Sequence, residues 1–215
     1  MWWMPVDRSA PDERLTTIGR NQAPVSWSPD GRVLAFNQMS PQTASDVFVL
    51  AVAGDRKPVP VVESKFNEGS PKFSPDGRWL AFCSNESGRP EVFVQAYPSG
   101  PRIQISTDGG TDPVWARSGK ELFYRSDRKM MVVDVTLQPF RASKPRALWE
   151  GDYAHGLSSF CGPAGPSSSN YDVTPDGQRF LMIKEQESPE LVSTRVQVVL
   201  NWPEELKRLA EKKKP

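Results

Sequence analysis

The residue types that could support acyl-transfer chemistry lie close together near residue 155. His155 is the single histidine of the chain, and Ser158 and Ser159 follow it in the stretch GLSSFCG. A serine nucleophile needs a neighbouring base, and many hydrolases present it in a GxSxG turn. GLSSFCG does not have that pattern, so we interpret His155 as a loop or surface histidine and expect no catalytic residue.

The two cysteines offer a second kind of nucleophile. A reactive thiolate needs a lowered pKa, and nothing beside Cys161 in the sequence would lower it. Cys83, in LAFCS, is expected to pack as a small apolar residue. There is no CxxC or Cys/His spacing for a metal, and we expect no disulfide between the two cysteines.

Repeated carboxylates raise the question of a metal site. Asp30, Asp76 and Asp176 recur in one local motif, but each belongs to a separate turn, so they are not expected to bind a shared ion. The stretch DGGTD at residues 108–112 lacks the ordered oxygen-ligand spacing of a calcium loop. We therefore expect no metal and no cofactor.

The composition narrows the classes of partner. With 27 basic and 26 acidic side chains in 215 residues, the net charge of +1 gives no reason to expect nucleic acid or a membrane surface as a partner. The 21 prolines are about twice the usual frequency and favour short strands joined by turns. No stretch resembles an export signal or a membrane span, so none is expected in the chain as written.

The clearest pattern is a nine-residue repeat, SPDGRVLAF at residues 28–36 and SPDGRWLAF at residues 74–82. Proline and aspartate suit the second and third positions of a tight turn, and glycine accepts the positive φ that often follows. Weaker copies occur in VWARSGKELFY and YDVTPDGQRFLM. The structural turn motif comprises Ser28, Pro29, Asp30, Gly31, Ser74, Pro75, Asp76, Gly77, Gly119, Pro175, Asp176 and Gly177.

The turn glycines are 46, 42 and 58 residues apart. A period in the forties with a hairpin in each unit is typical of β-propeller blades. Each hairpin is followed by a third, apolar strand and by a proline-bearing fourth strand suited to a sheet edge. We expect Trp27 and Trp115 to pack between blades. The predicted blades are 24–64, 70–107, 112–151 and 169–202.

The remaining segments fit an incomplete or closed propeller. Residues 1–20 resemble the outer strands of a partial blade, residues 156–170 an insertion loop, and residues 203–215 a short helix with a basic tail. The favoured architecture is all-β: about four four-stranded blades forming an open arc of a larger, six-bladed type of propeller. The alternative is a four-bladed ring that residues 13–18 close.

Several segments together resemble the TolB-like, WD-repeat-related bacterial β-propellers. The likeness is closest to the C-terminal propeller of bacterial serine/threonine protein kinases of acidobacterial type. It rests on SPDGRWLAF and on the following segments: SNESGRPEVFVQAYP (84–98), ISTDGGTDPVW (105–115), GKELFY (119–124), YDVTPDGQRFL (171–181) and VVLNW (198–202). The resemblance implies a propeller fold. It does not imply an activity, because one fold serves many functions.

The function expected is a non-catalytic module that binds a protein, a peptide or a small ligand through loops or a central face. One alternative is the sensory portion of a membrane-bound kinase, which would imply a periplasmic location. If the chain is complete as written, the expected location is cytoplasmic. Another alternative is the accessory domain of a prolyl-oligopeptidase-like hydrolase. Open blade faces predict self-association. Since the repeated residues serve the turn, a binding site is expected where the copies differ.

Overall fold

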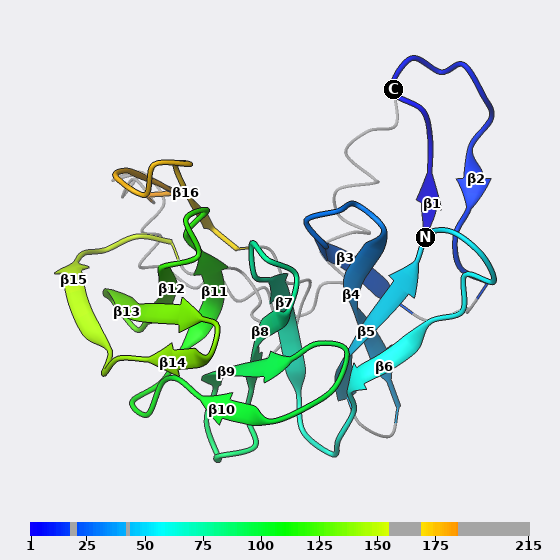
Figure 1. Ribbon diagram of the computed structural model, residues 1–215. Helices are drawn as coiled ribbons and strands as arrows, with labels where there is room; N and C mark the ends of the chain where they lie inside the picture. Colours follow the sequence, from blue (N-terminus) through cyan, green and yellow to red (C-terminus); the bar gives the residue numbers. More distant parts are fainter. Residues whose placement is uncertain (18–20, 42–43, 155–168, 185–215) are drawn as a thin grey trace, which may run out of the picture. The chain divides into compact units, whose positions relative to one another are not determined.

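The chain is all-β in the computed structural model, which describes residues 1–17, 21–41, 44–154 and 169–184 (Figure 1). In that part of the chain, no helix is long and apolar enough to cross a membrane. The expected helix at 203–215, the insertion loop at 156–170 and the last strand of the fourth blade lie outside the described residues, apart from residues 169 and 170.

Three sheets have the strand order expected of propeller blades, in which each strand pairs antiparallel with the next along the chain. The first sheet contains β3 (Gln22–Trp27), β4 (Val33–Ser40), β5 (Ala44–Ala51) and β6 (Val59–Val62). The second contains β7 (Glu68–Phe73), β8 (Trp79–Ser84), β9 (Glu91–Ala96) and β10 (Arg102–Gln104). The third contains β11 (Thr111–Trp115), β12 (Glu121–Ser126), β13 (Lys129–Leu137) and β15 (Arg146–Glu150).

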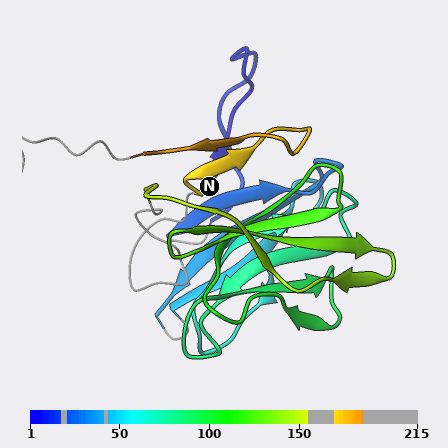
Figure 2. The same cartoon turned by 90° about the vertical axis from the view of Figure 1, so that its left-hand side faces the viewer.

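Two smaller sheets flank these three. A hairpin of β1 (Trp2–Trp3) and β2 (Glu13–Arg14) projects from the larger sheets (Figures 1 and 2). At the other end of the described chain, β16 (Tyr171–Val173) pairs with β17 (Phe180–Met182) around the last Pro-Asp-Gly turn. The open arc and the closed ring both stay predictions.

The third sheet also has a strand that the sequence analysis did not anticipate. β13 runs on to Leu137, and the chain turns back through Gln138 and Pro139 into β14 (Phe140–Ala142), which pairs with the end of β13. The first two sheets have no counterpart to this extra hairpin among the described residues.

The core lies between successive sheets because the strands are apolar on both faces. Leu80 and Phe82 of β8 pack toward the first sheet, whereas Ala81, which lies between them, packs toward the third. Alternation along a strand sends neighbouring side chains to opposite faces, and a sheet covered on both sides needs apolar residues on each. This explains why the expected inner strands are nearly continuous apolar runs.

The first strands of the second and third sheets each carry a proline beside a bulge. Pro71 follows Ser70, which has a φ of +55°, and Pro113 follows Asp112, which has a φ of +53°; the register shifts at both places. Within its sheet each of these strands pairs on one side only, so the missing proline N–H breaks no ladder. The sequence analysis assigned proline to the fourth strands and missed this second position.

Candidate functional site

Four residues considered for chemistry, His155, Ser158, Ser159 and Cys161, lie outside the described residues, so their interpretation stays a prediction. Cys83 is fully buried in β8, as expected of a small apolar residue, but its sulfur is disulfide-bonded. The expectation of no disulfide was therefore wrong for Cys83. Spacing alone cannot anticipate such a bond, because pairing depends on how the fold places two thiols.

The repeated aspartates are each used inside their own turn. Asp30 accepts hydrogen bonds from Ser28 Oγ at 2.6 Å and from the backbone N–H of Arg32 at 3.1 Å, and Asp76 and Asp176 accept the equivalent pairs. The hydrogen bond from Ser28 lowers the pKa of Asp30. Among the described residues, no group of three His, Cys, Asp or Glu side chains is placed to hold a metal ion.

The turn glycines adopt the left-handed conformation in all four copies. Their φ angles are +69° at Gly31, +72° at Gly77, +69° at Gly119 and +72° at Gly177. The turn at Gly119 has this geometry although Arg and Ser replace Pro and Asp. The motif residues are thus placed where they shape hairpins.

The opposite ends of the sheets carry buried carboxylates with contrasting surroundings. Glu91 has both oxygens engaged: Arg89 Nε lies 2.8 Å and the Gly109 N–H 3.0 Å from Oε1, and Ser106 Oγ donates to Oε2. Glu68 Oε1 accepts hydrogen bonds from Ser64 and Ser84, but its Oε2 has no hydrogen-bond partner in the part of the chain that the structure describes.

This incomplete bonding matters because Glu68 is fully buried. Burial raises the pKa of Glu68 to about 7, and the nearby charge of Asp46 adds to the rise, while the bond from Ser64 and the charge of Arg102 oppose it. The corresponding residue in the first sheet is Gln22, whose amide donates to Gln38 Oε1 at 2.9 Å. The ionisable side chain therefore makes the second sheet different from the first.

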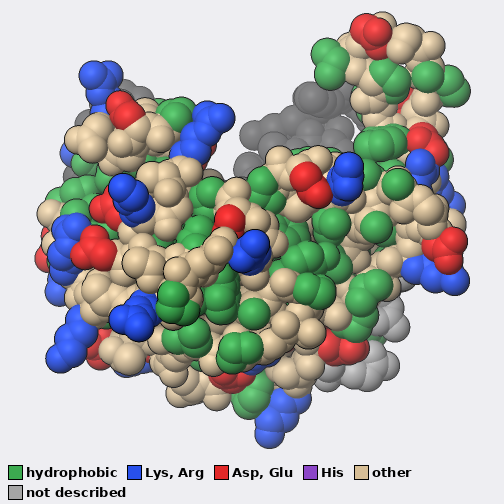
Figure 3. Space-filling view, in the orientation of Figure 1, with side chains coloured by type: hydrophobic (Ala, Val, Ile, Leu, Met, Phe, Trp, Pro, Cys, Tyr) green, Lys and Arg blue, Asp and Glu red, His purple; other side chains and the backbone are tan. Residues whose placement is uncertain are grey.

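A groove of about 550 Å³ lies between the second and third sheets, at the end where the SPDG turns lie. Apolar and aromatic side chains form most of its surface. Its lining residues are Arg78, Trp79, Ala96, Tyr97, Leu137, Gln138, Pro139 and Phe140. Hydrophobic side chains also gather over β8 and β9 on the face shown in Figure 3.

The walls of the groove are held by specific contacts. The Trp79 indole N–H donates to the Leu137 carbonyl at 3.1 Å, and its ring centroid lies 4.5 Å from that of Phe140. On the other side, the Tyr97 ring meets Phe73 edge-on at 5.0 Å, and burial raises the pKa of its hydroxyl. Because these rings are fixed before binding, a ligand would lose little free energy in ordering them.

The groove depends on residues in which the copies differ. Val33 and Val52 occupy the first-sheet positions that correspond to Trp79 and Tyr97. The other half of the lining, from Leu137 to Phe140, comes from the unanticipated β13–β14 hairpin. The signal in the sequence was the exchange of Val33 for Trp79 between two otherwise identical nonapeptides, but the partner hairpin comes from residues about sixty positions later.

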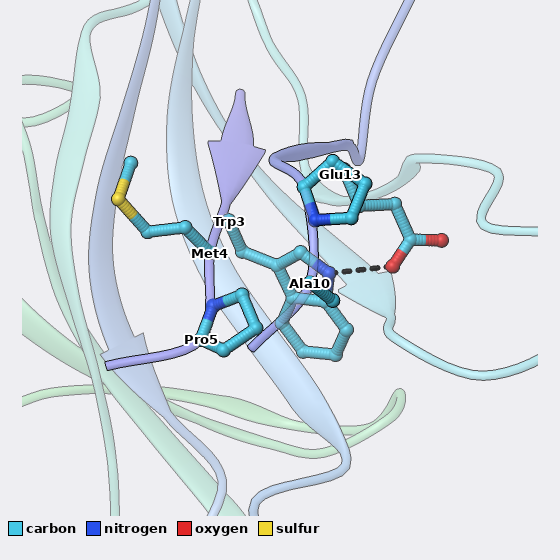
Figure 4. Close-up of a pocket in the computed structure, with 6 residues that line it drawn as sticks. Trp3, Met4, Pro5, Ala10 and Glu13 are labelled. Carbon is cyan, nitrogen blue, oxygen red and sulfur yellow. Dashed lines mark hydrogen bonds between the residues drawn. The ribbon is translucent and has the colours of Figure 1, made fainter. Parts of the chain in front are cut away.

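A second hollow, of about 340 Å³, lies in the β1–β2 hairpin and is lined by Trp3, Met4, Pro5, Ala10, Pro11 and Glu13 (Figure 4). Of the lining residues that the structure describes, Glu13 alone has a charged side chain. The Trp3 indole donates to its Oε2 at 2.6 Å and Arg56 donates to its Oε1, and these bonds lower the pKa of Glu13. Because both carboxylate oxygens of Glu13 already accept hydrogen bonds, this hollow offers a ligand less polar recognition than the groove beside Arg78 does.

Repeated antiparallel sheets stacked face to face define a propeller-type protein. Comparison with known sequences identifies the family within this class. The chain belongs to the TolB β-propeller family, because the family model for the TolB beta propeller domain matches residues 12–160. The Tol-Pal system protein TolB of Pseudomonas aeruginosa is 43% identical to it over 54 residues, which are 25% of this chain and 12% of that protein.

Solved structures show the same fold. The crystal structure of TolB from Acinetobacter baumannii matches with a TM-score of 0.53 and 18% identity, over 82% of this chain and 46% of that one. An oligogalacturonate lyase in complex with manganese matches with a TM-score of 0.55 and 12% identity, over 80% and 47%. The chain thus spans less than half of either structure, and since an enzyme stands beside TolB, the fold alone does not assign an activity.

Proposed function

We propose that this chain is a non-catalytic TolB-type propeller module that binds a partner protein through a peptide segment seated in the groove between the second and third sheets. The observation that carries the proposal is the paired aromatic wall of Trp79 and Phe140, which faces solvent beside Arg78. Aromatic side chains and arginine contribute most often to the energetic centres of protein interfaces. Membership of the TolB family supports an interaction role.

The test is selection of random heptapeptides displayed on phage against the immobilised full chain. Trp79→Val, which installs the first-sheet residue, should remove most of the binding of the selected peptides. Trp27→Val is the matched control, because Trp27 is an exposed tryptophan that does not line the groove. Peptides that bind equally well to the Trp79→Val variant would show that the groove is not the binding site.

The finer resemblance supports a place for this module in a larger protein. The segments that carry the resemblance together favour the sensory portion of a membrane-bound serine/threonine kinase. The alternative is the accessory domain of a prolyl-oligopeptidase-like hydrolase. The surrounding DNA distinguishes them: an upstream kinase domain and membrane span would support the first, and a downstream GxSxG segment would support the second.

A further inference from the structure

We infer that the groove selects peptides in which a carboxylate lies two residues from a bulky apolar side chain, with Arg78 binding the carboxylate. This inference rests on the proposed function, because it names the chemistry of the peptide bound at the same groove. It depends on the charge of the lining residues, on the state of the Arg78 side chain, and on the comparison with the first sheet.

Among the described residues that line the groove, Arg78 alone is charged. Its backbone carbonyl accepts the N–H of Tyr97 at 2.8 Å, which anchors the residue at the rim. Its guanidinium, however, makes no hydrogen bond or ion pair with the described residues. The acid of its own turn, Asp76, accepts hydrogen bonds from Ser74 Oγ and from the Arg78 backbone N–H instead.

An unpaired guanidinium at the edge of an apolar surface favours a carboxylate partner. Arginine presents two parallel N–H donors that match the two oxygens of a carboxylate, and such charge-assisted bonds are about twice as strong as neutral ones. The partly apolar surroundings strengthen this attraction relative to open water. The remaining lining side chains are neutral, so none of them competes for Arg78.

One acid outside this turn also acts on the groove: the charge of Asp30 raises the pKa of Tyr97, after the larger effect of burial. Asp30 does not line the groove. Its carboxylate is already hydrogen-bonded to Ser28 and lies 4.0 Å from the Arg32 guanidinium. The negative charge of Asp30 is therefore partly offset by Arg32, and Arg78 determines the charge preference of the groove.

The apolar part of the peptide is recognised by the rings. Trp79 and Phe140 make one wall, and Tyr97 makes another. A groove of about 550 Å³ is large enough for one or two bulky side chains. In an extended peptide, residues two apart point to the same side, so an apolar side chain in the groove and a carboxylate on Arg78 suit alternate positions.

The experiment uses the full chain and a library of acetylated heptapeptides with Leu, Phe or Trp at position three and Glu, Gln or Lys at position five. Binding is measured by fluorescence anisotropy. We expect the Glu set to bind about tenfold more tightly than the Gln set. The Lys set should bind least, and the preference for Glu should shrink as salt rises.

Two variants separate the inference from the proposed function. Arg78→Gln should abolish the preference for Glu over Gln while leaving the binding that depends on Trp79. Arg32→Gln, at the equivalent turn position of the first sheet, should leave the preference intact. If wild-type protein binds the Glu and Gln sets equally, the inference fails and the proposed function stands. If no set binds in a manner that Trp79→Val reduces, both fail.

Discussion

The first and second sheets begin from nearly the same sequence, yet they present different surfaces. Both contain Ser-Pro-Asp-Gly-Arg followed by a leucine, an alanine and a phenylalanine, and the buried side chains and turn angles agree. They differ at Val33 and Trp79, and at Gln22 and Glu68. The shared residues satisfy requirements that every blade has, whereas the exchanged residues give the second sheet an aromatic groove and a buried acid.

The largest expected effect tests how far the shared core residues are equivalent. Phe82 is fully buried between the first and second sheets, so Phe82→Ala should lower the free energy of unfolding by about 3–5 kcal/mol. Phe36, its first-sheet counterpart, packs with Leu15 of the N-terminal segment, which lies outside the large sheets and is therefore expected to adjust to the space more easily. Phe36→Ala should cost less. Urea unfolding measures both, and equal losses would contradict this contrast between the two cores.

The next effect concerns the pH dependence of stability. Burial raises the pKa of Glu68 to about 7, above the ordinary glutamate value that it has when unfolded. The folded state therefore keeps a proton that the unfolded chain releases, and its contribution is present at low pH and is lost as pH rises toward 7. The loss amounts to about 3 kcal/mol across this window.

Glu68→Gln installs the residue that the first sheet has at this position and should remove that part of the pH dependence. Thermal unfolding between pH 5 and about pH 8 provides the measurement. Glu91→Gln is the control for the loss of a buried, hydrogen-bonded carboxylate, since Glu91 has partners on both oxygens and its replacement should destabilise the protein. An unchanged slope in Glu68→Gln would show that another group titrates.

A smaller effect tests the turns. Gly31 and Gly77 have nearly the same positive φ, so a valine at either position should cost about 1–2 kcal/mol. A Cβ at Gly77 would also lie 3.3 Å from Pro29 of the neighbouring turn, whereas one at Gly31 would meet nothing within 4 Å. Gly77→Val should therefore be the more harmful. Chemical denaturation measures the loss of stability in the two variants. A larger loss in Gly31→Val would show that the two turns do not pack together.

The smallest effect concerns the two exposed arginines. Arg32→Gln and Arg78→Gln should each change the free energy of unfolding by no more than about 0.5 kcal/mol, because neither side chain makes a buried contact. Their melting temperatures should match that of the parent protein. A marked loss of stability in Arg78→Gln alone would mean that Arg78 stabilises the sheet. The peptide affinity of that variant would then be corrected for its unfolded fraction.

Local signals predicted the fold better than they predicted the candidate site. The Pro-Asp-Gly turns predicted the hairpins, and the strands that are apolar on both faces predicted the stacked sheets. The structure confirmed the all-β propeller architecture. The hairpin of Leu137 and Phe140 was missed, because the other two described sheets have no such pairing and the repeat therefore does not predict it. The disulfide of Cys83 was missed because pairing depends on residues far apart in the chain.

The sequence by itself determined the repeating unit, because a turn with positive φ and a strand buried on both faces constrain the residues that form them within a few positions. It also marked Trp79 as the residue that departs from the repeat. Only the tertiary structure decided what that departure means. The groove exists because the end of β13 crosses to the second sheet and places Phe140 against Trp79, and Glu68 is unusual because the packed sheets deprive it of water. Both properties arise from contacts between segments that are far apart in the sequence.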